Sequence, residues 1–235
     1  MDRASSRKGS KLVRVNADFT QRVVVRSETV DWVPSPMKGV DRKMLDRIGD
    51  EVARATTIVR YAPGSAFSAH THDGGEEFLV LDGVFSDEHG DFPAGSYIRN
   101  PPTSSHTPSS VDGCTILVKL HQFDPSDRTH VRIEMGKMRG VAPSDRAGVT
   151  VTPLFSDDRE DVRVEEWAAH SDVTLDLPGG GEVFVLEGSF EESGDSLGER
   201  DWLRLPPGGT LAATAGAAGA KVWIKSGHLT DAVGG

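Results

Sequence analysis

The chain has 235 residues, of which 37% are hydrophobic and 26% charged, so it can bury a core and is not disordered throughout. Its formal net charge of -10 has the wrong sign for a surface that neutralises phosphates, so we expect no nucleic-acid partner. No stretch approaches the roughly 18 consecutive apolar residues of a membrane helix, so we expect no membrane span. Because Cys114 is the single cysteine, a disulfide framework within the chain is excluded, and we expect a cytoplasmic protein.

The N-terminal segment is rich in basic residues. No apolar run follows them that would act as the core of a secretory signal. The basic residues are Arg3, Arg7, Lys8, Lys11 and Arg14. We therefore predict a basic, flexible tail over residues 1–20.

Beyond this tail, short runs rich in β-branched and aromatic residues alternate with clusters of Gly, Pro, Asp and Ser. Such runs lie at residues 22–26, 56–61, 78–81 and 115–120. Runs of this length between turn formers are typical of strands, and Gly and Pro interrupt most windows in which a helix could form. The sequence predicts an all-β chain in which any helix is short.

The chain also repeats itself. Residues 70–106 align without a gap on residues 175–211, at an offset of about 105. The shared positions include Gly74/Gly179, Gly75/Gly180, Glu77/Glu182, Gly83/Gly188, Arg99/Arg204, Pro101/Pro206 and Pro102/Pro207. Glycines and prolines at fixed spacing imply shared turns, so we predict two copies of one β-fold, joined by a polar linker over residues 124–148. The alternative is one long β-sandwich in which the similarity is accidental.

The first copy contains residues suited to bind a transition metal. His70 and His72 are two positions apart, which on a strand directs both imidazoles to one face. Glu76 follows a Gly-Gly turn that can return its carboxylate toward the pair, and His106 comes later. Three imidazoles and one carboxylate suit zinc, iron, manganese, nickel or copper better than calcium or magnesium. The His-x-His pair alone would equally fit exposed alternating histidines or one buried, hydrogen-bonded ring.

The spacing of these residues resembles the two sequence motifs of the cupin superfamily. The matching positions are Gly64, His70, His72, Glu76 and Gly83 for the first motif, and Gly95, Pro101 and His106 for the second. Thr103 stands where the second motif has glycine. Residues 74–102 resemble more narrowly the ChrR-like cupin family, which is related to acetylacetone dioxygenase-type cupins.

This resemblance implies two cupin jelly-roll barrels in tandem, an arrangement called a bicupin. It places a metal-binding cupin domain at residues 21–123 and, after the linker, a second cupin domain at residues 149–235. It also implies one divalent transition metal ion per chain, with iron or zinc expected before manganese or nickel. The implied metal ligands are His70, His72, Glu76 and His106.

The second copy lacks this ligand set. At the same offset the four positions hold Leu175, Leu177, Gly181 and Leu211. Leucines in place of inward-facing histidines predict a dry apolar interior. We therefore expect the second domain to be degenerate and metal-free.

Comparison of the two copies also separates two adjacent carboxylates. Glu77 keeps a counterpart, Glu182, in the copy that has lost its ligands, whereas Glu76 is lost together with the histidines. We therefore interpret Glu76 as the metal ligand and Glu77 as a residue that supports the fold of both copies.

The roles of three further residues stay open from the sequence. Tyr97 and Arg99 flank the ligand segments, and Arg99 could orient an anionic or carbonyl substrate. Both nevertheless have counterparts beside the ligand-free copy, which favours a structural role equally. His89 lies among turn formers, as a solvated loop residue or as part of a loop that serves the site.

Two functions are compatible with the resemblance. The first is a non-haem metal dioxygenase acting on a small carbonyl compound, because three histidines and one glutamate leave two positions of an octahedral ion open. The second is a metal-dependent ligand- or stress-sensing regulatory cupin that resembles the C-terminal part of ChrR anti-sigma factors. Their anti-sigma module is not expected, because residues 1–40 contain no Cys or His for its zinc site. In either case we expect a small-molecule ligand, and exposed sheet edges favour a homodimer.

Overall fold

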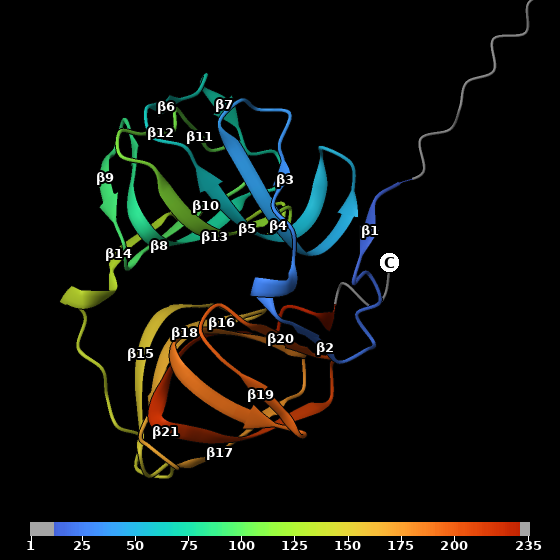
Figure 1. Cartoon of the computed structure of the whole chain (residues 1–235), viewed down its shortest axis with the longest axis vertical. Helices are drawn as coiled ribbons and strands as arrows, with labels where there is room; N and C mark the ends of the chain where they lie inside the picture. Colours follow the sequence, from blue (N-terminus) through green and yellow to red (C-terminus); the bar gives the residue numbers. More distant parts are fainter. Residues whose placement is uncertain (1–11, 231–235) are drawn as a thin grey trace, which may run out of the picture.

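The computed structural model describes residues 12–230, and two lobes built of β-strands make up this part of the chain (Figure 1). The described helices are two 3₁₀ turns, Ser27–Thr29 (η1) and Met135–Lys137 (η2). The prediction of an all-β chain with only short helices is therefore confirmed. Of the basic tail predicted over residues 1–20, residues 1–11 lie outside the described part. None of the described helices is long and apolar enough to cross a membrane.

The first lobe contains an antiparallel sheet of eleven strands and a separate sheet of two strands. The main path of the large sheet is, in spatial order, β1 (Arg14–Val15), β4 (Val40–Gly49), β5 (Ala53–Tyr61), β13 (Cys114–Leu120), β8 (Glu76–Asp87), β10 (Ser96–Asn100) and β14 (Val131–Glu134). Shorter strands beside this path are β3 (Val33–Pro34), β6 (Ser65–Ala66), β9 (Gly90–Pro93) and β12 (Ser109–Ser110). The two-stranded sheet pairs β7 (His70–Thr71) with β11 (Ser105–His106).

The second lobe repeats this antiparallel architecture with eight strands. Its main path is β15 (Val149–Ser156), β16 (Asp161–Trp167), β21 (Gly209–Ser226), β18 (Gly181–Glu192), β20 (Trp202–Leu205) and β2 (Val23–Val25), while β17 (Asp172–Leu177) pairs with β21 and β19 (Asp195–Leu197) with β18. The neighbours β8, β10 and β13 of the first lobe correspond to β18, β20 and β21 of the second. The two copies predicted from the repeat are therefore present as two jelly-roll domains.

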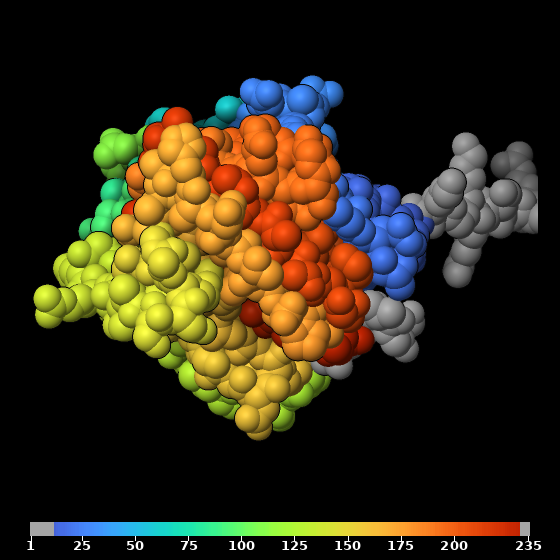
Figure 2. Space-filling model, turned by 90° about the horizontal axis from the view of Figure 1, so that it is seen from below, coloured from blue at the N-terminus to red at the C-terminus, as the bar shows by residue number. Residues whose placement is uncertain are grey.

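Two segments tie the lobes together. β2 precedes every strand of the large first sheet except β1, yet it pairs with β20 of the second lobe. β14 lies within the segment expected as a linker, but it pairs with β10 along the edge of the first sheet. Seen from below, the second lobe fills most of the face, with the N-terminal segment at its margin (Figure 2). The chain thus crosses between the lobes both before and after the first domain.

Alternation along β8 explains why this strand is apolar on both faces. Phe78 and Val80 pack in the core of the first lobe, whereas Leu79 between them packs in a third core that lies between the lobes. In the second lobe Val183 points into the interior and Phe184 into the shared core. Because successive side chains of a strand point to opposite faces, each of these strands separates an internal core from the domain interface.

Two reciprocal ion pairs lie buried in this interface. Lys119 Nζ of β13 is 2.6 Å from Glu182 Oε2 of the second lobe, and Lys225 Nζ of β21 is 2.5 Å from Glu77 Oε2 of the first. All four side chains are at most 1% exposed. Within each lobe the lysine and glutamate face each other on paired strands, Lys119 opposite Glu77 and Lys225 opposite Glu182. Each domain therefore supplies one cation and one anion to the other.

The residues around these pairs extend the reciprocal pattern. Tyr97 donates its hydroxyl hydrogen to Glu77 at 2.6 Å, and Trp202, at the equivalent position, donates its indole N–H to Glu182 at 3.0 Å. The guanidinium of Arg99 lies 2.7 Å from the carboxylate of Glu160 in the second lobe. Tyr97 and Arg99 therefore support the domain interface, which resolves the alternative that the sequence left open for them.

His228 gives this buried network a dependence on pH. Its Nε2 lies 2.9 Å from Glu182 Oε1, and complete burial lowers its pKa to about 4, although the Glu182 hydrogen bond and charge act in the opposite direction. In the unfolded chain the same imidazole titrates near its ordinary value of about 6.5. Below that value the folded protein therefore binds fewer protons than the unfolded chain, so the free energy of unfolding decreases as the pH is lowered.

We predict that His228 removes roughly 3 kcal/mol from the free energy of unfolding between about pH 6.5 and pH 4. The variant His228→Gln keeps a donor toward Glu182 but does not titrate, so its stability should fall less over this range. Denaturant unfolding at several pH values gives the free energy of unfolding of both proteins. In the difference between them, the contributions of the other titrating groups cancel. Parallel pH profiles would contradict the prediction.

Candidate metal centre

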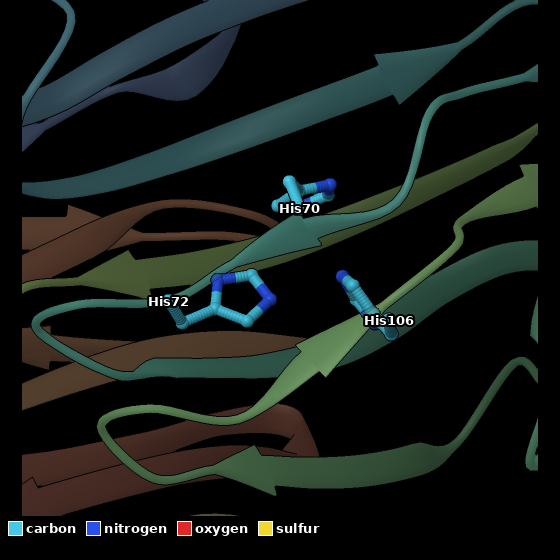
Figure 3. Close-up of side chains that lie close together, drawn as sticks. All are labelled: His70, His72 and His106. Carbon is cyan, nitrogen blue, oxygen red and sulfur yellow. The ribbon is translucent and has the colours of Figure 1, made fainter.

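Three imidazoles converge at the small sheet of the first lobe (Figure 3). His70 and His106 are direct partners in the pairing of β7 with β11, and His72 follows two residues after His70. Their ligand-capable nitrogens all lie within 4.8 Å of one another. The ring centroids are 4.7–4.9 Å apart and the ring planes are inclined by 73–74°, so the three rings are arranged almost symmetrically around one point.

Two buried nitrogens of this cluster make no hydrogen bond to the described residues. Nε2 of His72 and Nε2 of His106 are buried and have no hydrogen-bond partner among the described residues. A buried polar atom left in this state costs about 1–3 kcal/mol, so two of them at one place require an explanation. Convergent imidazole nitrogens of this kind suit a transition metal ion, and the cluster can hold one.

Glu76 and Glu77 lie on opposite faces of β8. Glu76 Oε2 is 3.4 Å from His72 Nε2 and 3.6 Å from His106 Nε2, so its carboxylate belongs to the cluster. Glu77 points into the domain interface, where it pairs with Lys225. The structure therefore brings together all four residues named from the sequence and separates Glu77 from them.

The turn before Glu76 requires glycine. Gly75 has φ +76°, and a Cβ there would lie 2.5 Å from the ring of Phe123. A Cβ on Gly74 would lie 2.1 Å from Nδ1 of His121. Thr103, which replaces the glycine of the second motif, keeps a glycine-like backbone at φ +73°, and its N–H donates to the carbonyl of His72 at 2.9 Å. The loop before His106 is therefore formed despite the substitution.

Asp87 orients His106 and was not identified from the sequence. Its Oδ2 lies 3.2 Å from His106 Nδ1, and its side chain is 1% exposed. The hydrogen bond holds the proton on Nδ1 and directs Nε2 toward the cluster, the arrangement that metal-binding histidines commonly show. Asp87 lies just before the turn that contains His89, and the N–H of His89 donates to its other oxygen at 2.7 Å. His89 itself is an exposed loop residue.

The histidines differ in their affinity for protons. Burial lowers the pKa of His72 and outweighs the charge of Glu76 beside it. Burial also opposes protonation of His106, but the hydrogen bond to Asp87 and the charge of Glu76 outweigh it and raise its pKa. His72 therefore stays a neutral imidazole over a wider range of pH than His106.

A cavity of about 340 Å³ lies beside the cluster. His70, His72 and Glu76 form part of its wall, and the remainder combines apolar side chains with polar and charged ones. The apolar lining includes Met37, Val40, Val59, Phe67, Pro108, Val118 and Leu120. Tyr97 and Arg99 do not line the cavity. A concave site with an apolar part and convergent polar groups is the usual form of a small-molecule site.

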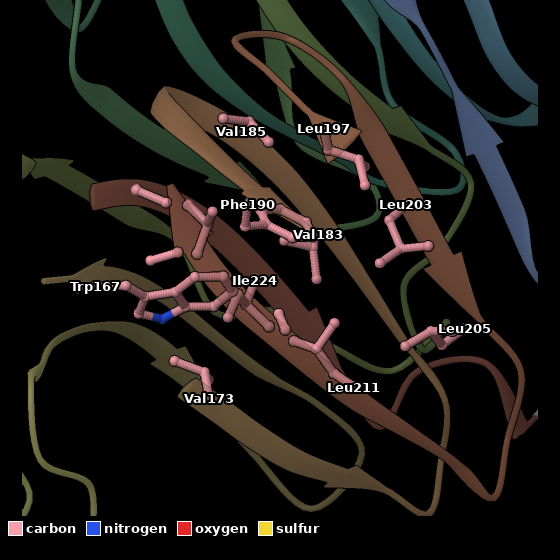
Figure 4. Packing of buried hydrophobic residues seen from close by; sticks show 14 of the residues in the cluster. Trp167, Val173, Val183, Val185, Phe190, Leu197, Leu203, Leu205, Leu211 and Ile224 are labelled. Atoms are coloured by element: carbon pink, nitrogen blue, oxygen red, sulfur yellow. The ribbon is translucent and has the colours of Figure 1, made fainter. Parts of the chain in front are cut away.

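The equivalent place in the second lobe is filled by side chains. Leu175 pairs with Leu211 in the same register in which His70 pairs with His106. Leu177 and Leu211 are buried in the core of this lobe, in which Figure 4 labels Leu211, and Leu175 packs against it. At Gly181, the counterpart of Glu76, a Cβ would lie only 3.0 Å from Leu177, so no larger side chain fits there without displacement.

Comparisons with known proteins agree with this architecture. Residues 20–124 match the ChrR cupin-like domain family. No curated protein sequence matches the chain. A candidate dioxygenase from Nostoc punctiforme has a similar structure, with a TM-score of 0.74 and 13% identity over 90% of this chain and 84% of that one.

Two other solved structures carry the same fold. The pirin YhhW of Escherichia coli in complex with nickel(II) aligns with a TM-score of 0.63 and 12% identity, over 88% of this chain and 98% of that one. A mutant of the oxalate decarboxylase OxdC of Bacillus subtilis aligns with a TM-score of 0.62 and 11% identity, over 91% of this chain and 79% of that one. Identities this low establish a shared fold and leave the activity open.

We predict that Asp87→Asn lowers the pKa of His106 in the metal-free protein, because an amide no longer stabilises the imidazolium. The ring-proton chemical shifts of His106, followed by NMR across pH, measure this value. Asp91→Asn removes an exposed carboxylate from the adjacent strand β9 and should leave the titration of His106 unchanged. An unchanged His106 titration in Asp87→Asn would mean that the carboxylate does not orient the ring.

Proposed function

Because residues 20–124 form a ChrR cupin-like domain, we propose that the chain is a metal-dependent dioxygenase that acts on a small carbonyl compound. In this proposal one divalent transition metal ion is held by His70, His72, Glu76 and His106. The first domain, residues 21–123, carries the ion, and the second, residues 149–235, carries none. The observation on which the proposal depends is the convergence of two buried, unpartnered imidazole nitrogens beside a carboxylate and an apolar cavity.

The donor set supports iron or zinc first, then manganese or nickel, because imidazoles with one carboxylate match ions of intermediate softness. A redox-active ion bound there would supply the one-electron chemistry toward dioxygen that side chains lack. The protein's own contribution is to hold the donors and the substrate. Asp87 fixes the ring of His106, Glu76 places a negative charge against the cation, and the apolar wall excludes water from the substrate.

The fold neighbours support the class of activity only. One of them is a candidate dioxygenase, and another is an oxalate decarboxylase, so the same scaffold serves different reactions. The sensing cupin remains the second candidate, because four protein donors also match a closed tetrahedral zinc site. Metal content distinguishes the two: a redox-active metal together with oxygen consumption favours the enzyme, and zinc at full occupancy without turnover favours the sensor.

We predict one metal ion per chain in protein purified without added metal, measured by elemental analysis. The variant His72→Leu copies the side chain found at Leu177 of the second domain and should retain almost no metal. The same variant should abolish oxygen uptake with a β-dicarbonyl substrate if the chain is a dioxygenase. Two ions per chain that survive dialysis against a weak chelator would contradict a metal-free second domain.

We predict opposite effects for the two adjacent glutamates. Glu76→Gln removes an anion facing the cation and should weaken metal affinity by at least about tenfold. Glu77→Gln should leave metal affinity intact and cost about 1–3 kcal/mol of stability, because Lys225 loses one of its two carboxylate partners and keeps Glu160 at 2.9 Å. Metal titration and denaturant unfolding of both variants test this. Weaker metal binding in Glu77→Gln than in Glu76→Gln would transfer the ligand role to Glu77.

A further inference from the structure

The cavity beside the histidine cluster also contains two arginines, Arg42 and Arg47, both from β4. Residues five apart on a regular strand point to opposite faces. The pairing of β4 with β5 shifts between Met44 and Asp46, and this bulge adds one residue between the two arginines. The bulge therefore brings both side chains to the cavity, as bulges beside functional sites often do.

Arg42 has hydrogen-bonding capacity that the protein does not use. Its terminal nitrogens lie 3.3 Å from the carboxylate of Glu51, whose side chain is 61% exposed. Its Nε is buried and has no hydrogen-bond partner among the described residues. An ion pair this long and this open to water holds the guanidinium only weakly. Arg42 Nε is thus available to a further acceptor, while the terminal nitrogens pair with Glu51.

Thr57 offers a second unused polar group in the same cavity. Thr57 lies on β5, adjacent to β4, and its side chain lines the cavity. Its hydroxyl oxygen is buried without a hydrogen-bond partner among the described residues, and the residue is 3% exposed. A threonine hydroxyl can donate to a carboxylate oxygen. The cavity wall therefore presents Arg42 Nε and Thr57 Oγ1 as two unpartnered groups.

The charge around the cavity also favours an anion. Among the lining residues, the charges of Arg42 and Arg47 cancel those of Glu51 and Asp73. Glu76 is the remaining anion, so a bound divalent ion would leave the cavity with one net positive charge. Arg47 donates to the backbone carbonyls of Gly49 and Asp50, which fixes its position. Burial and the charge of Arg42 lower the pKa of Arg47, and the charges of Glu51 and Asp50 offset this only in part.

We propose that the substrate of this site carries a carboxylate, which Arg42 and Thr57 bind while its carbonyl end faces His70, His72 and Glu76. The placement of the carbonyl end rests on the proposed function, whereas the carboxylate subsite rests on Arg42 and Thr57. A guanidinium and a hydroxyl acting on one carboxylate give charge-assisted hydrogen bonds in a cavity whose wall also holds apolar side chains. Arg42 is then a specificity-determining residue that selects carbonyl acids over neutral ketones.

The test compares two β-dicarbonyl probes of similar size, acetopyruvate, which ends in a carboxylate, and neutral hexane-2,4-dione. Isothermal titration calorimetry on the full chain loaded with zinc measures binding without turnover. Acetopyruvate should bind at least about tenfold more tightly than the dione. Arg42→Met and Thr57→Val should each weaken acetopyruvate binding, Arg42→Met by about tenfold or more, and should leave both the binding of the dione and the zinc content unchanged.

Two further variants make the comparison specific. Arg42→Lys keeps a positive charge and should retain part of the lost affinity. Arg60→Met removes an exposed arginine that pairs with Asp41 on the same two strands outside the cavity, and it should change neither affinity. If Arg42→Met does not fold, Thr57→Val and Arg42→Lys still carry the test.

The outcomes separate this inference from the proposed function. Equal affinity for the two probes, unchanged in Arg42→Met and Thr57→Val, would overturn the carboxylate subsite and leave the metal site standing. A chain that binds none of zinc, iron, manganese and nickel would overturn the proposed function. The same titrations on the metal-free chain would then decide the carboxylate subsite, because Arg42 and Thr57 are not among the proposed metal ligands.

Discussion

The two reciprocal ion pairs, Lys119 with Glu182 and Lys225 with Glu77, are the constraint on which the rest of the molecule depends. Transferring charged groups from water into a protein interior costs several kcal/mol each, and only close pairing with further hydrogen bonds offsets that cost. Here each charge of one domain is neutralised by the other domain. In the assembled chain the close ion pairs of both lysines, Lys119 with Glu182 and Lys225 with Glu77, therefore cross the interface.

This arrangement determines the orientation of the site through β8. Consecutive residues on that strand face in opposite directions, so fixing Glu77 in the interface fixes Glu76 in the cavity. The register of β8 with β10 and β13 then places the turn before Glu76, and with it His72, beside His106. The position of the candidate metal centre is therefore coupled to the packing of a domain that contributes no residue to it.

The strand-rich fold could be predicted from local turn and strand signals, the repeat from matching positions about 105 residues apart, and the histidine cluster from the resemblance to the cupin motifs. Glycines and prolines mark turns, and a His-x-His pair on a strand has one geometry. The difference between Glu76 and Glu77 is likewise visible in the sequence, because only Glu77 has a counterpart, Glu182, in the second copy. These inferences needed only the spacing of residues along the chain.

Other features could not be predicted because they depend on irregular or distant pairing. The bulge in β4 reverses the expected facing of Arg47 relative to Arg42, and nothing in the local sequence marks it. Asp87 became recognisable only when β8 and β11 placed it beside His106. The pairing of β2 with a strand almost 180 residues away likewise leaves no periodic signal in either segment.

The reciprocal interface has a consequence for how the two halves can diverge after duplication. The second domain holds leucines where the first holds the histidine cluster, and these leucines lie in its core or pack against it. It is not free to lose Glu182 or Lys225, since each serves as the counterion of a residue in the other half. One copy can therefore lack the histidine cluster and still be required, because it supplies the counterions of the buried charges in the other copy.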